Sequence, residues 1–203
     1  MNTNEKYALA GLVMDYALKN GAEQVSVSIN DSRQSDIDIR DQKIDRLKES
    51  ARNSLTIELF VEKKYSSHST SRLKKEELFH FVEEAIAATR FLAEDEFRSL
   101  PEPELYYKGG GDDLKVLDSK LDAVDAKTKI DLATLVHDEA FKKDERIISV
   151  TSTYSDSISN RVLVTSNGFK GDSSTSNINL SARVSVNGDT GRPSDSWYEN
   201  AIF

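Results

Sequence analysis

Apolar residues recur at helical spacing at the start of the chain and alternate with polar residues soon afterwards. The first pattern predicts a helix that begins at about Asn4. The helix is expected to end at Asn20, because Gly21 follows at the position where a left-handed C-terminal cap is typical. The alternation predicts two strands, around residues 25–30 and 36–40, each with one face exposed to solvent. This alternation favours antiparallel pairing, with the helix covering the apolar face.

A hairpin that opens onto a second helix is predicted over residues 54–89. The sequence SLTIELFVEKKYSSHSTSR alternates apolar and polar residues up to Val61, turns at Lys63-Lys64, and reaches a small-residue step at Ser69-Thr70. The residues that place one apolar face on the following helix are Leu78, Phe81, Val82, Ala85, Ile86 and Thr89. We expect this helix and the first one to share a face of the sheet.

Prolines and glycines interrupt any periodicity in the middle of the chain. Pro101, Pro103 and Gly109-Gly110-Gly111 place a surface linker at about residues 93–122, between two sub-lobes. A third helix is predicted beyond it, over about residues 127–143. The three strands predicted after that helix cover Ile147–Tyr154, Ile158–Thr165 and Asn177–Val186. The expected fold class is α+β, a mainly antiparallel sheet partly covered by about three helices.

In their order and spacing, these segments resemble the N-terminal half of the TldD/PmbA family. Its members carry a similar hairpin that ends in a small-residue step, here Ser69-Thr70, and a later TSNG, here Thr165–Gly168. The stretches AIAATR and LPEPEL resemble the PmbA branch more than the TldD branch. The resemblance implies that residues 1–203 are the N-terminal domain of a PmbA-like protein, truncated before its C-terminal domain. The apolar ending WYENAIF agrees with that expectation.

Composition and charge exclude several classes of protein. The chain is 37% apolar and 31% charged, its first twenty residues lack the apolar core of a signal peptide, and no stretch could span a bilayer. These features predict a cytoplasmic protein. The absence of cysteine excludes a thiolate zinc site and a cysteine nucleophile within the chain. A formal net charge of −8 argues against direct contact with nucleic acid or an anionic membrane.

No residue of the chain is assigned a catalytic or metal-binding role. The resemblance implies that the family's catalytic subunit binds zinc through His-Glu-x-x-x-His on one helix and a distant Cys. This chain has only three histidines, and even the one on the third predicted helix, His137, is followed by Asp138. No zinc or other cofactor is therefore expected in this segment, and whether the chain is itself an enzyme is left open.

Each histidine has another interpretation. His137 falls among apolar residues of the third helix, which is typical of a hydrogen-bonded, partly buried side chain. His80 neighbours two glutamates on the second helix, where a surface ion pair is expected. A nucleophile–base pair at His68 is disfavoured, because adjacent strand residues point to opposite faces and Ser67 and Ser69 are then out of reach.

The resemblance implies a subunit of a TldD/PmbA-type metallopeptidase assembly that acts on unfolded or leader peptides. A TldD-like subunit supplies the metal site and a PmbA-like subunit completes the chamber. A TldD-like partner, self-association as a dimer, or both are therefore expected. Sheet edges hold extended peptides through main-chain hydrogen bonds. The edge near residues 66–70 is the candidate peptide site, with Ser69 and Thr70 as its named positions.

Two other functions stay open on the sequence alone. The chain would act without a C-terminal domain if it were a stand-alone, non-catalytic module that binds a protein or peptide. The older name of the family, modulator of DNA gyrase, implies a regulatory partner of that enzyme. Direct binding to DNA is disfavoured by the acidic balance of the chain.

Overall fold

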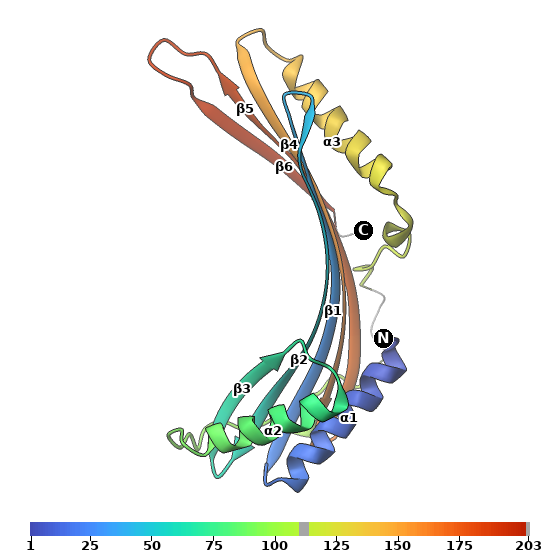
Figure 1. The fold of residues 1–203 in the computed structure, drawn as a ribbon, viewed down its shortest axis with the longest axis vertical. Coiled ribbons are helices and arrows are strands. Elements are labelled where there is room, and N and C mark those ends of the chain that lie inside the picture. The colour runs from blue at the N-terminus through green and yellow to red at the C-terminus, as the bar shows by residue number, and fades with distance from the viewer. Residues whose placement is uncertain (110–113, 202–203) are drawn as a thin grey trace. The chain divides into compact units, whose positions relative to one another are not determined.

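A computed structural model of the chain describes residues 1–109 and 114–201 (Figure 1). Gly110 and Gly111 of the predicted linker lie outside the described residues, as do the last two residues of the WYENAIF ending. The elements in chain order are α1 (Thr3–Lys19), β1 (Gln24–Arg40), β2 (Lys43–Val61), β3 (Lys64–Thr70), α2 (Lys75–Thr89), η1 (Pro103–Leu105), η2 (Leu121–Ala123), α3 (Ala126–Phe141), β4 (Ile147–Thr165), β5 (Lys170–Val186) and β6 (Ser194–Ala201). Three α-helices and a six-stranded antiparallel sheet confirm the predicted α+β class.

The six strands are hydrogen-bonded in the order β3-β2-β1-β4-β5-β6. Residues 24–40 form one continuous strand, and so do residues 147–165, although the sequence predicts two shorter strands in each case. Where the apolar alternation of β1 stops, at residues 30–34, the side chains are partly or fully exposed. The interruption therefore marks a part of β1 outside the apolar clusters, and it does not mark the end of a strand. The sequence does not predict β6, because its residues are all exposed and have no buried face.

The chain divides into two compact units. Unit 1 contains residues 1–31, 52–113 and 160–173, and unit 2 contains residues 32–51, 114–159 and 174–203. β1, β2, β4 and β5 each contribute residues to both units. The linker predicted at residues 93–122 is itself divided between them, and the sub-lobe boundary placed there stays a prediction.

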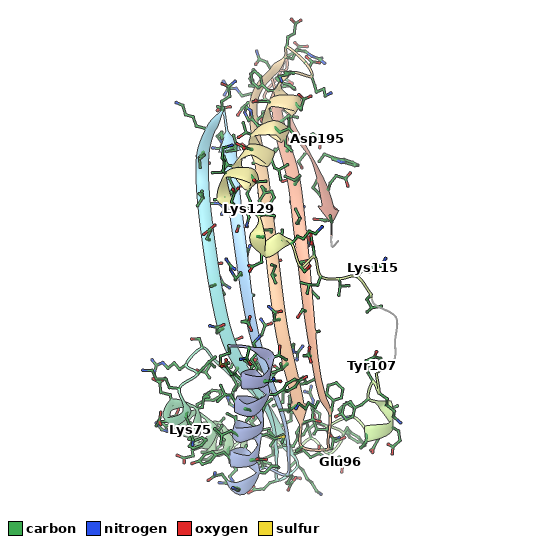
Figure 2. All side chains as sticks on the ribbon, turned by 90° about the vertical axis from the view of Figure 1, so that its right-hand side faces the viewer. Lys75, Glu96, Tyr107, Lys115, Lys129 and Asp195 are labelled. Atoms are coloured by element: carbon green, nitrogen blue, oxygen red, sulfur yellow. The ribbon has the colours of Figure 1, made fainter. Side chains whose placement is uncertain are left out.

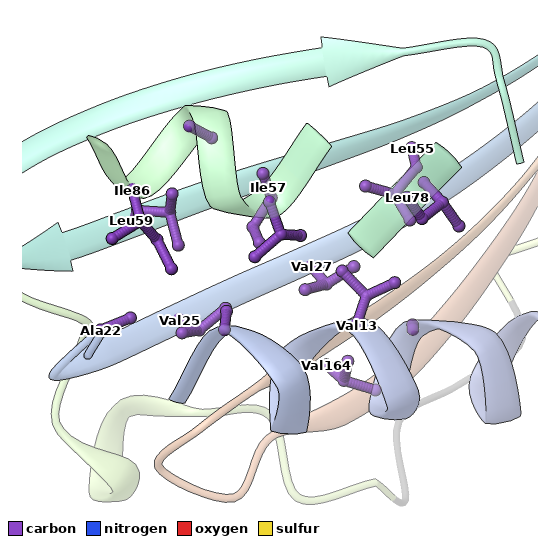
Figure 3. Packing of buried hydrophobic residues seen from close by; sticks show 14 of the residues in the cluster. Val13, Ala22, Val25, Val27, Leu55, Ile57, Leu59, Leu78, Ile86 and Val164 are labelled. Atoms are coloured by element: carbon purple, nitrogen blue, oxygen red, sulfur yellow. The ribbon is translucent and has the colours of Figure 1, made fainter. Parts of the chain in front are cut away.

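The apolar core of unit 1 is formed by α1, α2 and the strand segments next to them (Figure 3). α1 begins at a capping box, in which Asn2 and Glu5 each accept the other's main-chain N–H at 2.9 Å. α1 and α2 contact each other, which confirms that they share a face of the sheet. Buried residues of this core include Val13, Val25, Val27, Leu55, Ile57, Leu59, Leu78 and Val164.

Unit 2 has a smaller apolar core next to α3. The helix begins at Asp125, whose carboxylate accepts from the Thr128 N–H at 2.7 Å. The residues buried together are Ile37, Ile39, Ala133 and Tyr154. Throughout the described ranges, no helix combines the length and apolar character needed to cross a bilayer.

Each unit buries a lysine at the fourth residue of a helix. Lys6 of α1 is 3% exposed and pairs with Asp31 of β1. Lys129 of α3 is 8% exposed and pairs with Asp156 of β4. A charged group stays in a protein interior only when it is paired or hydrogen-bonded. In both units, therefore, an ion pair fixes the start of a helix to the strand that follows it in the chain.

The turns on both sides of β2 place consecutive non-glycine residues in the left-handed conformation. Asp41 and Gln42 precede β2 with φ of 47° and 63°, and Glu62 and Lys63 follow it with φ of 52° and 60°. Two successive residues with positive φ are typical of a type I′ hairpin turn. The second turn therefore lies one residue earlier than the predicted Lys63-Lys64 turn.

Lys63→Gly is expected to stabilise the protein by up to about 1 kcal/mol, because glycine adopts positive φ without the strain of a Cβ atom. The Lys63 carbonyl accepts from the Asp95 N–H at 2.8 Å, and this main-chain bond is kept in the variant. Urea denaturation would measure the change in the free energy of unfolding. Lys63→Val is the opposite control, since a β-branched residue is strained in this region. A Lys63→Gly protein no more stable than wild type would contradict the strained turn.

Candidate functional site

The candidate peptide site lies on the edge strand β3. β3 pairs antiparallel with β2, from Val61 opposite Lys64 to Leu55 opposite Thr70. It is the first strand in the sheet order, so within the described ranges no strand flanks its other side. Successive residues of an edge strand direct their main-chain groups alternately toward and away from the partner. About half of the main-chain groups of β3 therefore face away from β2.

The side chains of Ser69 and Thr70 both make local hydrogen bonds. The hydroxyl oxygens of Ser69 and Thr56 lie 2.8 Å apart across the paired strands. The Thr70 hydroxyl accepts from the Arg72 N–H at 3.1 Å, just beyond the end of β3. The two hydroxyls therefore hold the end of the strand in place. A peptide added at this edge would bond to the main chain of β3, and a role for these two positions in peptide binding stays a prediction.

His68 belongs to a chain of hydrogen bonds that the sequence does not predict. Its Nε2 lies 2.9 Å from the Ser66 hydroxyl, which in turn lies 2.5 Å from the Thr89 hydroxyl of α2. The Thr89 hydroxyl donates to the Ala85 carbonyl at 2.6 Å. Each hydroxyl has a single proton, so Ser66 donates to Thr89 and accepts from the Nε2–H of His68. His68 is a donor in this chain, and it does not act as a base toward Ser66.

The sequence argument against serine catalysis concerns Ser67 and Ser69, but the serine that His68 contacts in the structure is Ser66. His68 does reach a serine, because Ser66 lies two residues earlier on the same face of β3, but the Ser66 proton is already donated to Thr89. Burial lowers the pKa of the His68 imidazole, which favours its neutral form. The group connects β3 to α2 and has no activated nucleophile.

Unit 2 contains a cavity of about 320 Å³ lined by charged and polar residues, among them Lys129 of α3 (labelled in Figure 2). The Lys129 ammonium lies 2.6 Å from the Asp156 carboxylate and donates to the Ser35 hydroxyl at 2.9 Å. The Tyr154 hydroxyl donates to the same carboxylate at 2.7 Å. Burial and this hydrogen bond raise the pKa of the Tyr154 hydroxyl. Lys129 is thus a paired cation, and a nucleophilic role would require the neutral amine.

The sequence does not predict this polar cluster. The only local signal is that Lys129 lies one helical turn before Ala133, on the face of α3 that the fold buries. Its partner Asp156 lies two residues after Tyr154 on the same buried face of β4, although an acidic residue on a strand is ordinarily expected to be exposed.

No metal site is formed by the residues that the structure describes. Among them, no three histidine, aspartate or glutamate side chains come close enough together to hold a metal ion. The Nε2 of His137 accepts from the Gln42 N–H at 3.3 Å, which confirms the predicted hydrogen-bonded histidine, but the residue is 1% exposed and thus fully buried, whereas partial burial is predicted. His80 lies 3.5 Å from the Glu84 carboxylate at the surface, as predicted. The residues present do not fit the zinc site that the resemblance implies for a catalytic subunit.

Comparison with known domains places both units in one family. A domain described as PmbA/TldA metallopeptidase domain 1 matches residues 25–89, and one described as PmbA/TldA metallopeptidase central domain matches residues 119–202. The chain belongs to the PmbA/TldD metallopeptidase family. The family expected from the hairpin and the later motifs is thereby confirmed. Within the PmbA/TldD domains, β3 lies in domain 1, and Lys129 and Asp156 lie in the central domain.

Solved structures share this PmbA/TldD fold. A candidate modulator of DNA gyrase from Bacteroides thetaiotaomicron is 41% identical, with a TM-score of 0.94 over 100% of this chain and 46% of that one. A candidate modulator of a DNA gyrase from Thermotoga maritima is 21% identical, with a TM-score of 0.74 over 97% and 43% of the two chains. TldE from Thermococcus kodakarensis is 14% identical, with a TM-score of 0.77 over 96% and 43%.

The chain spans less than half the length of each of these three proteins. No curated protein matches it.

Proposed function

We propose that the chain is the N-terminal part of a PmbA-like subunit in a cytoplasmic TldD/PmbA-type metallopeptidase assembly. The assembly would act on unfolded or leader peptides, and a TldD-like partner would supply the metal site. Self-association of the PmbA-like subunit is a further contact that this proposal allows. The chain's contribution would be to hold an extended peptide at the open edge of β3.

The observation that carries this proposal is the edge strand within a metallopeptidase domain. β3 lies in the range that matches PmbA/TldA metallopeptidase domain 1, and its outer side is unpaired among the described strands. An added peptide strand is held by main-chain hydrogen bonds that do not depend on its sequence. Such binding suits an assembly whose substrates are unfolded chains. Since the described residues form no metal cluster, peptide holding and metal chemistry would lie in different parts of the assembly.

The proposal predicts that proline at the end of β3 slows peptide cleavage. Neighbouring residues direct their N–H groups to opposite sides, so either Ser69 or Thr70 offers its N–H to the open edge. Proline at that position removes the donor and leaves the pairing with β2 intact. In the assembly of the intact protein with its TldD-like partner, kcat/KM for an unfolded peptide is expected to fall about 10-fold, the effect of losing a hydrogen bond of about 1.4 kcal/mol.

Making Ser69→Pro and Thr70→Pro separately identifies the informative variant, because the one that faces β2 should lose stability and the other should not. Ser69→Ala and Thr70→Ala keep the main-chain N–H and shorten only the side chain, so their effect on cleavage should be smaller than that of proline. Circular dichroism and thermal unfolding identify the proline variant that keeps wild-type stability, and a wild-type cleavage rate from that variant would rule out the β3 edge as the peptide site.

A second function, regulation of DNA gyrase, is favoured by the name of the Bacteroides thetaiotaomicron protein, which is 41% identical to this chain. With a net charge of −8, a contact with the gyrase protein is more favourable than a contact with its DNA. Affinity purification of the intact protein separates the two functions. Recovery of a TldD-like protein supports the peptidase assembly, whereas recovery of gyrase without it supports regulation. Peptide binding with neither partner would support a stand-alone binding module.

A further inference from the structure

The sheet of unit 2 has a groove on the face opposite α3. Val150, Ser152 and Tyr154 of β4 are buried, and the Ser152 hydroxyl donates to the Ala133 carbonyl of α3. Thr151 and Thr153 alternate with them and line a groove of about 510 Å³ on the other face. β1, β5 and β6 line the rest of this groove.

Two arginines in the groove lack a carboxylate partner. The Arg40 guanidinium donates to the Thr151 hydroxyl at 3.1 Å, and Arg183 donates to the Ser194 hydroxyl at 3.1 Å. Neither forms an ion pair with any described residue, unlike the nearby Arg46, which pairs with Asp38 at 2.9 Å. Both are exposed to solvent. The groove is therefore locally cationic on a chain that carries a net charge of −8.

The strand that borders the groove has the features of a peptide-binding edge. β6 pairs only with β5, so its outer side is open within the described ranges. Tyr198 is 64% exposed and lies opposite Ser181, on the groove face of the sheet, whereas the side chain of its neighbour Trp197 lies on the other face, opposite Ala182. Exposed aromatic side chains supply apolar contact area at a small cost in conformational entropy. Two cationic groups, one aromatic ring and the open main-chain groups of β6 thus lie together.

We propose that this groove binds an acidic, extended segment of a peptide, with its carboxylates on Arg40 and Arg183 and an apolar side chain on Tyr198. Guanidinium groups form short, charge-assisted hydrogen bonds to carboxylates, often through both oxygens. The occupant is a peptide and not a nucleic acid, because the two arginines of the groove can pair with two carboxylates, whereas a nucleic acid carries a phosphate at every nucleotide and needs more cationic contacts. This inference rests on the proposed function in taking an unfolded peptide as the ligand.

Fluorescence anisotropy with the intact protein tests the groove directly. The probe is a labelled, unstructured 12-residue peptide that carries glutamate at alternate positions and one central leucine, and the matched probe has glutamine in place of each glutamate. The glutamate peptide is expected to bind about 10-fold more tightly, and Arg40→Gln/Arg183→Gln should abolish that preference. Arg52→Gln, an exposed arginine elsewhere on β2, should leave it unchanged.

Several results would overturn the inference. They are equal affinity for the two peptides, an unchanged preference in the double variant, and an equal loss in the Arg52→Gln control. A single-stranded oligonucleotide that binds more tightly than the glutamate peptide, and that also depends on Arg40 and Arg183, would reassign the groove to nucleic acid.

A cleavage assay separates this inference from the proposed function. If the assembly with a TldD-like partner cleaves both peptides but neither binds through Arg40 and Arg183, the groove is not a peptide-binding site and the proposed peptidase function stands. If the glutamate peptide binds through these arginines and the assembly cleaves neither peptide, the groove is confirmed as a peptide-binding site and the proposed peptidase function is wrong.

Discussion

Lys129→Met is expected to lower the free energy of unfolding by about 3–5 kcal/mol, the cost of leaving one partner of a buried ion pair without the other. The side chains of Lys129 and Asp156 are only 10% and 7% exposed, and their charged groups are 2.6 Å apart. Methionine keeps the apolar stem of lysine but removes the ammonium. The Asp156 carboxylate then retains the Tyr154 hydroxyl as a donor and loses its cation. Urea denaturation followed by circular dichroism measures the loss.

Lys127→Met is the matched control for this substitution. Lys127 lies on the same helix and pairs with Asp131, but its side chain is 81% exposed. Exposed pairs four residues apart on a helix contribute only about 0.3–0.5 kcal/mol. If Lys129→Met cost no more than Lys127→Met, the pair with Asp156 would not contribute as a buried ion pair.

The double variant tests whether the uncompensated charge causes the loss. Adding Asp156→Asn to Lys129→Met removes the negative charge, and the asparagine carbonyl can still accept from the Tyr154 hydroxyl. We expect the double variant to recover about 1–3 kcal/mol relative to Lys129→Met. A further loss in the double variant would show that lost packing, and not charge, dominates at this position.

Helices were predictable because their signals are local. The sequence predicts a first helix that ends at about Asn20, and α1 ends at Lys19, with Asn20 as its cap and Gly21 at φ 102°. The capping box at its start involves residues only three apart. Such interactions are contained within a few residues of sequence, so the pattern determines both ends of the helix to within a residue or two.

The paired groups that fix each helix to a strand were not predictable. Lys129 and Asp156 are separated by the rest of α3, a turn and about half of β4, and from the sequence alone each is expected to be an ordinary surface charge. The same holds for Ser66 and Thr89, which lie on different elements and meet only when α2 packs against β3. These contacts depend on the register of β-strands and the placement of helices over them, and neither is a local property.

Of the two candidate sites, one lies on a strand that the local sequence pattern predicts and the other lies on a strand that it does not predict. The edge near Ser69 and Thr70 was predictable as a strand, because the hairpin alternates clearly, although its position at the end of the sheet order follows from topology. The groove around Arg40 and Arg183 was not predictable, since β6 has no buried face and therefore no alternation. A strand that pairs with one neighbour and buries neither face has no alternation of apolar and polar residues from which it could be predicted.

Ile57→Ala is expected to lower the free energy of unfolding by about 2–5 kcal/mol. Ile57 is fully buried in the core of unit 1, between neighbouring core residues Leu55 and Leu59 on the same face of β2 (Figure 3). Alanine removes three carbon atoms from this site and leaves a cavity that α2 and β1 can only partly close. Urea denaturation measures the loss, and the slope of the transition should be unchanged if the folded state keeps its compactness.

Ile44→Ala on the same strand isolates the effect of burial. Both substitutions replace isoleucine by alanine within β2, so they share the change in strand propensity, but Ile44 is 51% exposed and Ile57 is 0% exposed. We expect Ile44→Ala to cost less than about 1 kcal/mol, so the difference between the two variants reports the core of unit 1. A loss at Ile44 as large as that at Ile57 would mean that the first half of β2 is covered in solution by another chain or domain, which would locate a contact surface of the assembly.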